Sequence, residues 1–324
     1  MTFGAELGLG PGEEFDRIRS LARALGSHAA GLGDDCALVD LGGEVLAAST
    51  DLSIENVHFR RDWLSFGEIG WRSAAGALSD LAAVGATPIG VLTGIGVPGT
   101  SLPSELDQLM AGVGSLLEET GGVVLGGDLS ASPVWTVSVT VLGRARRPVR
   151  RSGGKPGDSV WVTGALGGAR AALETWLGGG QPAPESRKSF AQPSPRLLAG
   201  AWLAEHGAGA MIDLSDGLGG DARHLAAASE VGITIDLSLL PVHSAVPDVA
   251  LRIGEDPRVF AAEGGEDYEL LALLPPEFTP AMASRLEAHA GIPLTRVGSV
   301  EAGEGVRLLL DGNPVEVAGY DHFR

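Results

Sequence analysis

Six short segments of the sequence place a carboxylate directly after glycine or beside an apolar run, where it could bind a cation. They are GDD with Asp34 and Asp35, STD with Asp51, LSD with Asp80, GGD with Asp128, DLSDG with Asp213 and Asp216, and GGED with Glu266 and Asp267. Any one of them has an ordinary explanation, because Asp is common in turns and at helix starts. The set is harder to explain, because unpaired buried carboxylates are costly and 23 Lys and Arg residues face 41 acidic ones. The pattern therefore predicts that metal ions neutralise these carboxylates.

The ligand types indicate which metal to expect. Hard oxygen ligands favour Mg²⁺ over zinc or copper, and the sequence has no paired set of Cys and His residues. The twelve-residue spacing of a calcium loop is also absent. Mg²⁺ usually keeps water ligands and bridges one or two carboxylates to phosphate, while glycine lets backbone N–H groups approach phosphate oxygens. The sequence therefore predicts chemistry on nucleotide phosphates with several Mg²⁺ ions.

Standard nucleotide-binding motifs are not found. The segment GALGGA at 164–169 lacks the Lys-Ser/Thr pair of a Walker loop, although a strand is expected before it and a helix after it. It is therefore either a tight strand-to-helix turn or a turn whose N–H groups face an anion. The protein-kinase signature is also absent.

A basic segment and two single residues complete the candidates. The segment contains Arg144, Arg146, Arg147, Arg150, Arg151 and Lys155. A guanidinium there could hold a phosphate with two hydrogen bonds, although most basic side chains in such a loop are simply solvated. His58 stands alone in NVHF, where a histidine is more often structural. Cys36 follows two acidic residues, which raise the pKa of a thiol, so we do not expect it to be a nucleophile.

Composition excludes several classes of function. A net charge of −18 argues against a nucleic-acid partner or an anionic membrane surface. The single cysteine permits no intramolecular disulfide and is consistent with a reducing compartment. The N-terminal segment lacks the apolar core of a secretory signal, and no apolar run is long enough for a membrane helix. We therefore expect a soluble cytoplasmic protein with no nucleic-acid or membrane partner.

The elements that must position these residues are mixed along the chain, so we expect an α+β fold. Helical periodicity or caps predict helices at 13–26, from Ser65, from Ser104, from about 195 and at 279–290. Apolar runs between turns predict strands at 36–41, 44–51, 87–98, 121–128, 135–145, 159–163 and 232–240. The chain of 324 residues exceeds one usual core, and a Gly/Pro-rich turn favours two domains, 1–150 and 151–324. Residues 178–196 show no periodicity and are expected to form a loop or linker.

Eight motifs carry a resemblance to a known family. They are GLGDDCAL, STDLSIENVHF, LSDLAAVGATP, LGGD, RSGGKPGD, IDLSDGL, GGEDYEL and GYDHF, in this order between residues 31 and 323. Together they closely resemble the thiamine-monophosphate kinase family. The combination of STD and VHF with GGEDYEL and GYDHF is specific to that family within its superfamily. The superfamily also includes aminoimidazole ribonucleotide synthetase, selenide water dikinase and a hydrogenase-maturation protein.

The resemblance implies a reaction in which ATP and thiamine monophosphate give ADP and thiamine diphosphate. It implies an N-terminal α/β domain whose sheet pairs with that of a second copy in a homodimer, and a C-terminal α/β sandwich domain. The acceptor phosphate oxygen is already an anion at neutral pH, so positioning and cations should supply most of the catalysis. We therefore expect direct in-line transfer without a covalent phospho-enzyme.

Matched motif by motif, the resemblance also implies roles for single residues, and none of them is a covalent nucleophile. The metal ligands would be Asp35, Ser49, Thr50, Asp51, Asp80, Asp128, Asp213 and Asp216, with Asp34 beside them. ATP would contact Gly127, Asp128, Arg151 and Ser215. The thiamine substrate would contact His58, Glu266 and Tyr320.

The chain departs from the family pattern at two places. Asn56 stands before VHF, where the family often has Gly. Asn tolerates a left-handed backbone, so we expect the turn to survive. The segment SFAQ before PSPR lacks the basic residues expected there, which puts any phosphate role of the 178–196 linker in doubt.

Two alternatives remain open at this point. Another enzyme of the superfamily, a ligase or dikinase, would explain the carboxylates and glycines equally well. It would not explain VHF, GGEDYEL and GYDHF together, and selenide chemistry would need a reactive cysteine near the N-terminus, where none precedes Cys36. A passive acidic ion-binding protein is the second alternative, but it would tolerate its acids in solvated runs rather than singly at the ends of elements.

Overall fold

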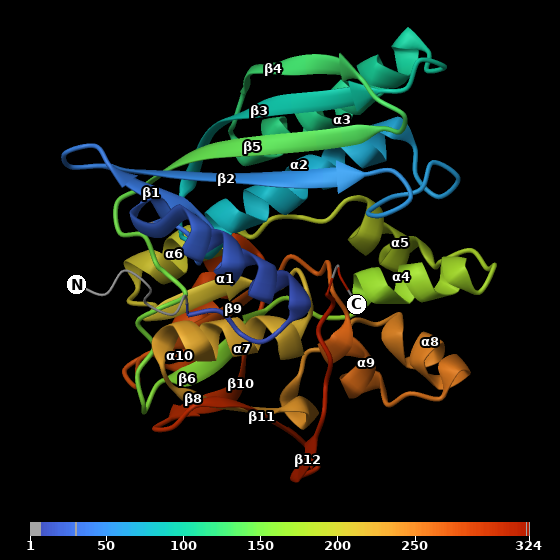
Figure 1. The fold of residues 1–324 in the computed structure, drawn as a ribbon. Coiled ribbons are helices and arrows are strands. Elements are labelled where there is room, and N and C mark those ends of the chain that lie inside the picture. The colour runs from blue at the N-terminus through green and yellow to red at the C-terminus, as the bar shows by residue number, and fades with distance from the viewer. Residues whose placement is uncertain (1–7, 30, 322, 324) are drawn as a thin grey trace.

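The computed structural model describes residues 8–29, 31–321 and 323. The first half of the chain forms a five-stranded sheet in the order β1–β2–β5–β3–β4, drawn in the upper part of Figure 1. Its strands are β1 (Ala37–Asp40), β2 (Val45–Ile54), β3 (Thr87–Val97), β4 (Val124–Ala131) and β5 (Thr136–Ala145). Neighbouring strands are antiparallel except for β3 and β4, which run parallel.

Two helices cover one face of this sheet, α2 (Phe66–Ala83) and α3 (Pro103–Thr120). The predicted capping box starts α2: the Ser65 hydroxyl accepts the Glu68 N–H, and the Glu68 carboxylate accepts the Ser65 N–H. A Cβ on Gly70 would lie 1.9 Å from the Leu109 carbonyl oxygen, so the two helices pack backbone to backbone. α2 also contacts β7 and α6 of the second half, and nearly all of its residues are buried. It is therefore the element that joins the two halves.

The second half forms a seven-stranded sheet in the order β12–β11–β8–β10–β6–β9–β7. Its strands are β6 (Ser159–Thr163), β7 (Ala210–Asp213), β8 (Gly232–Asp236), β9 (Leu270–Leu274), β10 (Leu294–Glu301), β11 (Gly305–Leu310) and β12 (Asn313–Val315). Its helices are α4 (Gly168–Leu177), α5 (Pro184–Ala191), α6 (Leu197–Glu205), α7 (Leu218–Ser229), α8 (Val246–Ile253), α9 (Pro257–Glu263) and α10 (Pro280–Ala290). The N-terminal helix α1 (Glu13–Leu25) lies against this half (Figure 1), where the Gly10 N–H donates to Nδ1 of His224 on α7 at 2.8 Å. Short 3₁₀ helices span Gly26–Ala29 and Leu237–Leu239.

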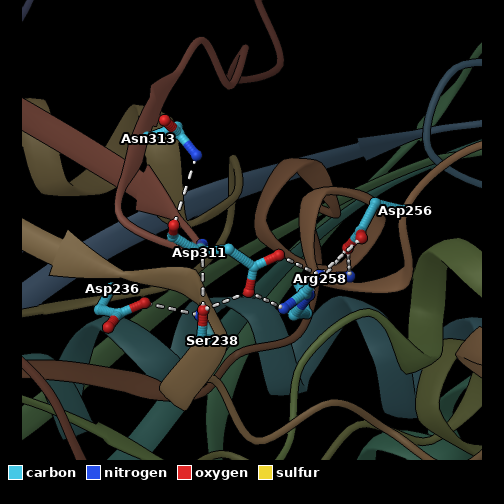
Figure 2. A network of polar contacts seen from close by, with 6 residues as sticks. All are labelled: Asp236, Ser238, Asp256, Arg258, Asp311 and Asn313. Atoms are coloured by element: carbon cyan, nitrogen blue, oxygen red, sulfur yellow. Dashed lines mark hydrogen bonds and ion pairs between the residues drawn. The ribbon is translucent and has the colours of Figure 1, made fainter.

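A surface network fixes the β11–β12 hairpin to the start of α9 (Figure 2). Arg258 donates to Asp256 at 2.9 Å and to Asp311, in the hairpin turn, at 2.9 Å. The Ser238 hydroxyl donates to the same Asp311 carboxylate at 3.2 Å. The contacts with Asp311 hold the C-terminal hairpin, and the network lies outside the cavity described below.

Most expected elements are confirmed, including the strands at β1–β6 and β8 and the helices α1, α2, α6 and α10. Two expectations are wrong. Ser104 does not cap α3, which begins at Pro103 with Leu102 as its N-cap. The 178–196 linker contains the helix α5, which was too short and too polar to show periodicity. No helix in the described part of the chain is long and apolar enough to cross a membrane.

Candidate active site

A cavity of about 620 Å³ lies between the two halves of the chain. Its acidic lining residues come from α1, β2, α2, the end of β7 and the segments after β7 and before β9, and are Glu14, Asp51, Asp80, Asp213, Asp216 and Glu266. Its apolar lining residues include Phe59, Trp63, Leu173, Leu177 and Phe190. The cavity therefore has both an acidic and an aromatic part, which suits a ligand with an ionic and a ring-containing portion.

Three carboxylates meet at the acidic part. One oxygen from each of Asp35, Asp80 and Asp213 lies within 4.8 Å of the other two. The Ser49 hydroxyl donates to Asp80 Oδ2 at 2.5 Å, and the Ser79 hydroxyl donates to Asp213 Oδ2 at 2.7 Å. The chain therefore brings together a strand end, a helix and the segment before β1 to form an acidic cluster, which we define as Asp35, Asp80 and Asp213.

Arg151 supplies a cation to this cluster. Its Nε and Nη2 donate to Asp35 Oδ1 at 3.1 and 2.6 Å. The neighbouring Asp34 has a different task, because its Oδ1 accepts the main-chain N–H groups of Asp35 and Arg151, both at 3.1 Å. In the described part of the chain, no donor reaches the buried Asp35 Oδ2. An orphaned carboxylate oxygen beside two further carboxylates is a donor set that fits a divalent cation.

The electrostatics of these carboxylates also favour a bound cation. Burial and, next, the nearby Asp35 charge raise the pKa of Asp213 to about 7. Burial raises the pKa of Asp51 to about 6. Burial and then the charges of Asp51, Asp213 and Asp35 raise the pKa of Asp80 well above its usual value. The raised pKa values show that the negative charges of these carboxylates are costly at this site unless a cation compensates them.

The alternation of β2 divides its three candidate ligands between two faces. Ser49 and Asp51 face α2, where Gly76 lets Asp51 approach: a Cβ on Gly76 would lie 3.1 Å from Asp51 Oδ2. The Thr50 hydroxyl points to the opposite face, 2.9 Å from the Thr140 hydroxyl. The Thr50 hydroxyl therefore points away from the acidic cluster, because side chains alternate along a strand. Its main chain remains beside the site, and a metal-binding role for Thr50 stays a prediction.

Gly127 and Asp128 lie away from the cluster within one chain. Asp51, Val139, Thr93 and Gly127 form one row across four adjacent strands. Three strand spacings separate Asp51 from Gly127, which is about 14 Å. Asp128 follows on the edge strand β4, is exposed and does not line the cavity. Within one chain these two residues therefore lie outside the acidic cluster, and their roles in binding ATP and metal stay predictions.

The remaining candidates surround the cavity. His58, Ser215, Asp216, Glu266 and Tyr320 all line it. His58 Nδ1 accepts the Ile54 N–H at 3.1 Å, which fixes the imidazole on its own turn. The Ser215 carbonyl accepts the Glu266 N–H at 2.7 Å, and the Asp216 carbonyl accepts the Tyr320 N–H at 2.9 Å. Main-chain bonds thus tie the DLSDG, GGED and GYD segments into one wall.

The chain matches two family models and several known proteins. Residues 33–145 match the N-terminal domain of AIR synthase related proteins, and residues 155–311 match the C-terminal domain of the same group. The thiamine-monophosphate kinase of Escherichia coli O157:H7 is 36% identical over 324 residues, covering 95% of each chain. That of Halobacterium salinarum is 36% identical over 94% of this chain and 99% of its own. The solved structure of AaThiL complexed with AMPPCP and TMP has a TM-score of 0.86 at 33% identity, covering 96% of this chain and 97% of that one.

The chain belongs to the thiamine-monophosphate kinase family. The resemblance seen in the sequence motifs is thereby confirmed. The structure of the hydrogenase maturation protein HypE also superposes, with a TM-score of 0.74 at 20% identity, which shows a shared fold alone. The mixed α/β architecture with two family domains agrees with the expected fold class.

Three residues near the site of this thiamine-monophosphate kinase family member were not singled out from its sequence. Asp221 is buried in the first turn of α7, and its Oδ2 accepts the Asp216 N–H at 3.2 Å. Arg72 is buried on α2 and forms an ion pair with Glu266. Ser79 holds Asp213, as described above. Only the spacing of Asp221 after SDG could have indicated a capping role; the other two contacts join segments far apart in the sequence.

The open questions about GALGGA and Cys36 have structural answers. Both oxygens of Asp267 accept the Gly167 N–H, at 3.0 and 2.9 Å, so the turn already faces an internal carboxylate. Cys36 is buried, and its thiol donates to the Asp80 carbonyl at 3.3 Å. Burial and then the charge of Asp80 raise the pKa of the thiol, which confirms that Cys36 is not poised as a nucleophile.

The two departures from the thiamine-monophosphate kinase pattern also become clear. Asn56 has a φ of 66°, so the turn keeps the left-handed backbone that glycine would supply, as expected. The linker packs against α2 through α5: Arg187 forms an ion pair with Glu68, and the Trp71 indole donates to the Pro193 carbonyl at 2.9 Å. The linker therefore forms part of the wall of the cavity through Phe190.

Proposed function

We propose that this protein catalyses transfer of the γ-phosphoryl group of ATP to thiamine monophosphate, giving ADP and thiamine diphosphate. The observation that carries the proposal is the cavity between the two halves, which combines carboxylates with aromatic side chains in a chain of this family. Further support comes from AaThiL, a structural relative complexed with AMPPCP and TMP.

The carboxylates would hold several Mg²⁺ ions. The proposed ligands are Asp35, Ser49, Asp51, Asp80, Asp128, Asp213, Asp216 and the main chain of Thr50. Bound Mg²⁺ would neutralise the repulsion between the two anionic phosphates, which is the main barrier to this transfer. Asp35 Oδ2 is the best-placed ligand, because it is buried and no described donor satisfies it.

ATP would contact Gly127, Asp128, Arg151 and Ser215. A hollow of about 260 Å³ beside the cluster is lined by Gly31, Gly33, Asp34, Arg150 and Arg151. Two arginines and glycine N–H groups in one hollow suit a polyphosphate chain. Arg151 now binds Asp35, and cations in the cluster would free its guanidinium for a phosphate.

Thiamine monophosphate would contact His58, Glu266 and Tyr320, which line the cavity. The Glu266 carboxylate complements the positive charge of the thiazolium ring, and aromatic side chains can stack on it. The acceptor phosphate needs no strong base, so we propose that the side chains hold the two phosphates in line and that no phospho-enzyme forms. Recovery of a phosphorylated residue after incubation with ATP alone would contradict direct transfer.

We also propose the domain division 1–150 and 151–324 and a homodimer that pairs the five-stranded sheets. The face of this sheet opposite α2 exposes Leu52 and Leu92, 49% and 39% exposed, beside the Thr50 row. Strand register places Asp128 on the same face. Asp128 pairs with Gly94, Gly94 pairs with Ser138, and Ser138 pairs with Leu52, so the four residues form one row across the sheet. A second copy on this face would give Gly127 and Asp128 the ligand partners that one chain does not supply. Sedimentation should give twice the monomer mass, and a monomer would contradict the pairing.

The reaction is tested by incubating the protein with ATP, Mg²⁺ and thiamine monophosphate and separating the thiamine esters by chromatography. Thiamine diphosphate should form only when all three are present. ATP hydrolysis without thiamine diphosphate would instead favour another enzyme of the superfamily. Binding of Mg²⁺ with neither product would favour a passive ion-binding protein.

A further inference from the structure

A buried arginine of α2 joins three separate parts of the candidate active site. The Arg72 side chain is 5% exposed, yet it lines the cavity. Its Nη2 donates to Glu266 Oε1, a residue 194 positions away in the sequence. Its Nη1 donates to the Phe190 carbonyl at 2.6 Å, and the guanidinium lies 3.8 Å from the centre of the Phe190 ring. Arg72 therefore holds α2, the linker helix α5 and the GGED segment together.

Main-chain hydrogen bonds hold residues 266–268 in place, so the direction of the Glu266 side chain is what remains to be set. Glu266 and Tyr268 have φ values of 64° and 51°, which non-glycine residues rarely adopt and which cluster at functional sites. The Glu266 N–H donates to the Ser215 carbonyl at 2.7 Å, and the Tyr268 N–H donates to the Leu214 carbonyl at 2.9 Å. With the main chain fixed in this way, Arg72 selects where the Glu266 carboxylate points. That side chain is 29% exposed and lines the cavity, so it still reaches a ligand.

We propose that Arg72 is a positioning residue for the acceptor substrate, holding the Glu266 carboxylate and the Phe190 ring as adjoining walls of a subsite for a flat, positively charged heteroaromatic group. The inference rests on the proposed function, in which Glu266 contacts the thiamine portion. A carboxylate beside an aromatic face is the combination that attracts such a cation. Arg72 acts through Glu266 and Phe190, while the phosphates are handled at the acidic cluster. The resulting specificity is for the ring system of the acceptor.

The test is a double-mutant cycle with the variants R72M, E266Q and R72M/E266Q. Methionine replaces the aliphatic part of the arginine side chain and can still pack on Phe190, but it cannot orient Glu266. Loss of a hydrogen bond to a charged partner should raise KM for thiamine monophosphate about tenfold or more in R72M. The kcat and the KM for ATP should change less than about threefold, since the same groups do not contact the phosphates. In the E266Q background the R72M effect on KM should shrink below about threefold, because the residue through which Arg72 acts is already altered.

Two further variants complete the design. R72K keeps the buried charge but lacks the fork that reaches both Glu266 and Phe190, so it should have an intermediate KM, and it serves if R72M does not fold. R258Q removes an arginine from the surface network of Figure 2 and should leave every kinetic constant unchanged.

The outcomes separate the positioning role of Arg72 from the proposed function of the protein. An equal rise in KM from R72M in both backgrounds, or a main effect on kcat or on ATP, would overturn the positioning role and indicate direct contact with a phosphate. An R72K variant indistinguishable from the wild type would also overturn it. If the wild type makes thiamine diphosphate in these assays, failure of the cycle counts against Arg72 alone. If the wild type makes none, the proposed function itself fails, and this inference fails with it.

Discussion

Replacing Asp213 with Asn is expected to stabilise the metal-free protein at alkaline pH while abolishing its activity. Asp213 lies in a cluster whose three carboxylates approach within 4.8 Å, and the Ser79 hydroxyl donates to it at 2.7 Å. Asn retains an oxygen that can accept this hydrogen bond but carries no charge. The change therefore removes repulsion in the absence of metal and removes a ligand in its presence.

The magnitude follows from the raised pKa of Asp213, which burial and then Asp35 bring to about 7 from 3.8. A carboxyl with a raised pKa in the folded state contributes stability that is full below its unfolded pKa and is lost as the pH rises through the folded pKa. Each pKa unit corresponds to about 1.4 kcal/mol, so the wild type should lose up to about 3 kcal/mol relative to Asp213→Asn between pH 5 and pH 8. Two unit charges 4.8 Å apart at an effective dielectric constant of about 20 repel by about 3–4 kcal/mol, which is consistent with this size.

Urea denaturation of both proteins at pH 5 and pH 8, with a chelator present, measures the difference. Mg²⁺ at pH 8 should stabilise the wild type and have little effect on the variant. Asp158→Asn is the matched control, because Asp158 is buried outside the cluster and accepts the Lys155 N–H at 2.8 Å. If Asp213→Asn destabilises the metal-free protein equally at both pH values, the cluster is not under the electrostatic strain inferred here.

Two further changes test the geometry around the cluster. Gly76→Ala should lower kcat about tenfold or more with little loss of stability, because the new Cβ would lie 3.1 Å from Asp51 Oδ2 and 3.3 Å from the Tyr268 hydroxyl. An unchanged kcat in steady-state assays would show that the close approach of Asp51 to Gly76 is unimportant. Arg151→Gln should raise KM for ATP about tenfold or more, because an amide cannot replace a guanidinium at a polyphosphate. A normal KM for ATP in that variant would confine Arg151 to its pairing with Asp35.

Much of the fold could be predicted from local signals in the sequence. The capping box at Ser65 and Glu68 indicated the start of α2, and apolar runs between turns indicated the strands β2 and β5. Side-chain alternation along a strand also places the Thr50 side chain on the face opposite to Ser49 and Asp51, which matching the motif alone did not show. Helix α5 was not predicted, because eight residues with a polar composition show little hydrophobic periodicity.

The candidate site was predictable in its residue types but not in its arrangement. The contact of Arg72 with Glu266 joins residues 194 positions apart, and the contact of Ser79 with Asp213 joins residues 134 positions apart. Strand register, which the sequence does not contain, separates Gly127 from Asp51 by three strand spacings. Long-range packing thus decided which of the recurring carboxylates met in one place.

The most direct test of the central claim is a Mg²⁺ titration of thiamine diphosphate formation by the wild type and by Asp35→Asn, with thermal unfolding recorded for both. The account predicts Mg²⁺-dependent product from the wild type. It predicts that kcat falls at least about a hundredfold in the variant, because the orphaned Asp35 Oδ2 is the best-placed metal ligand of the site. It also predicts a cooperative unfolding transition in both proteins. A folded Asp35→Asn protein with wild-type turnover and the same Mg²⁺ dependence would contradict it.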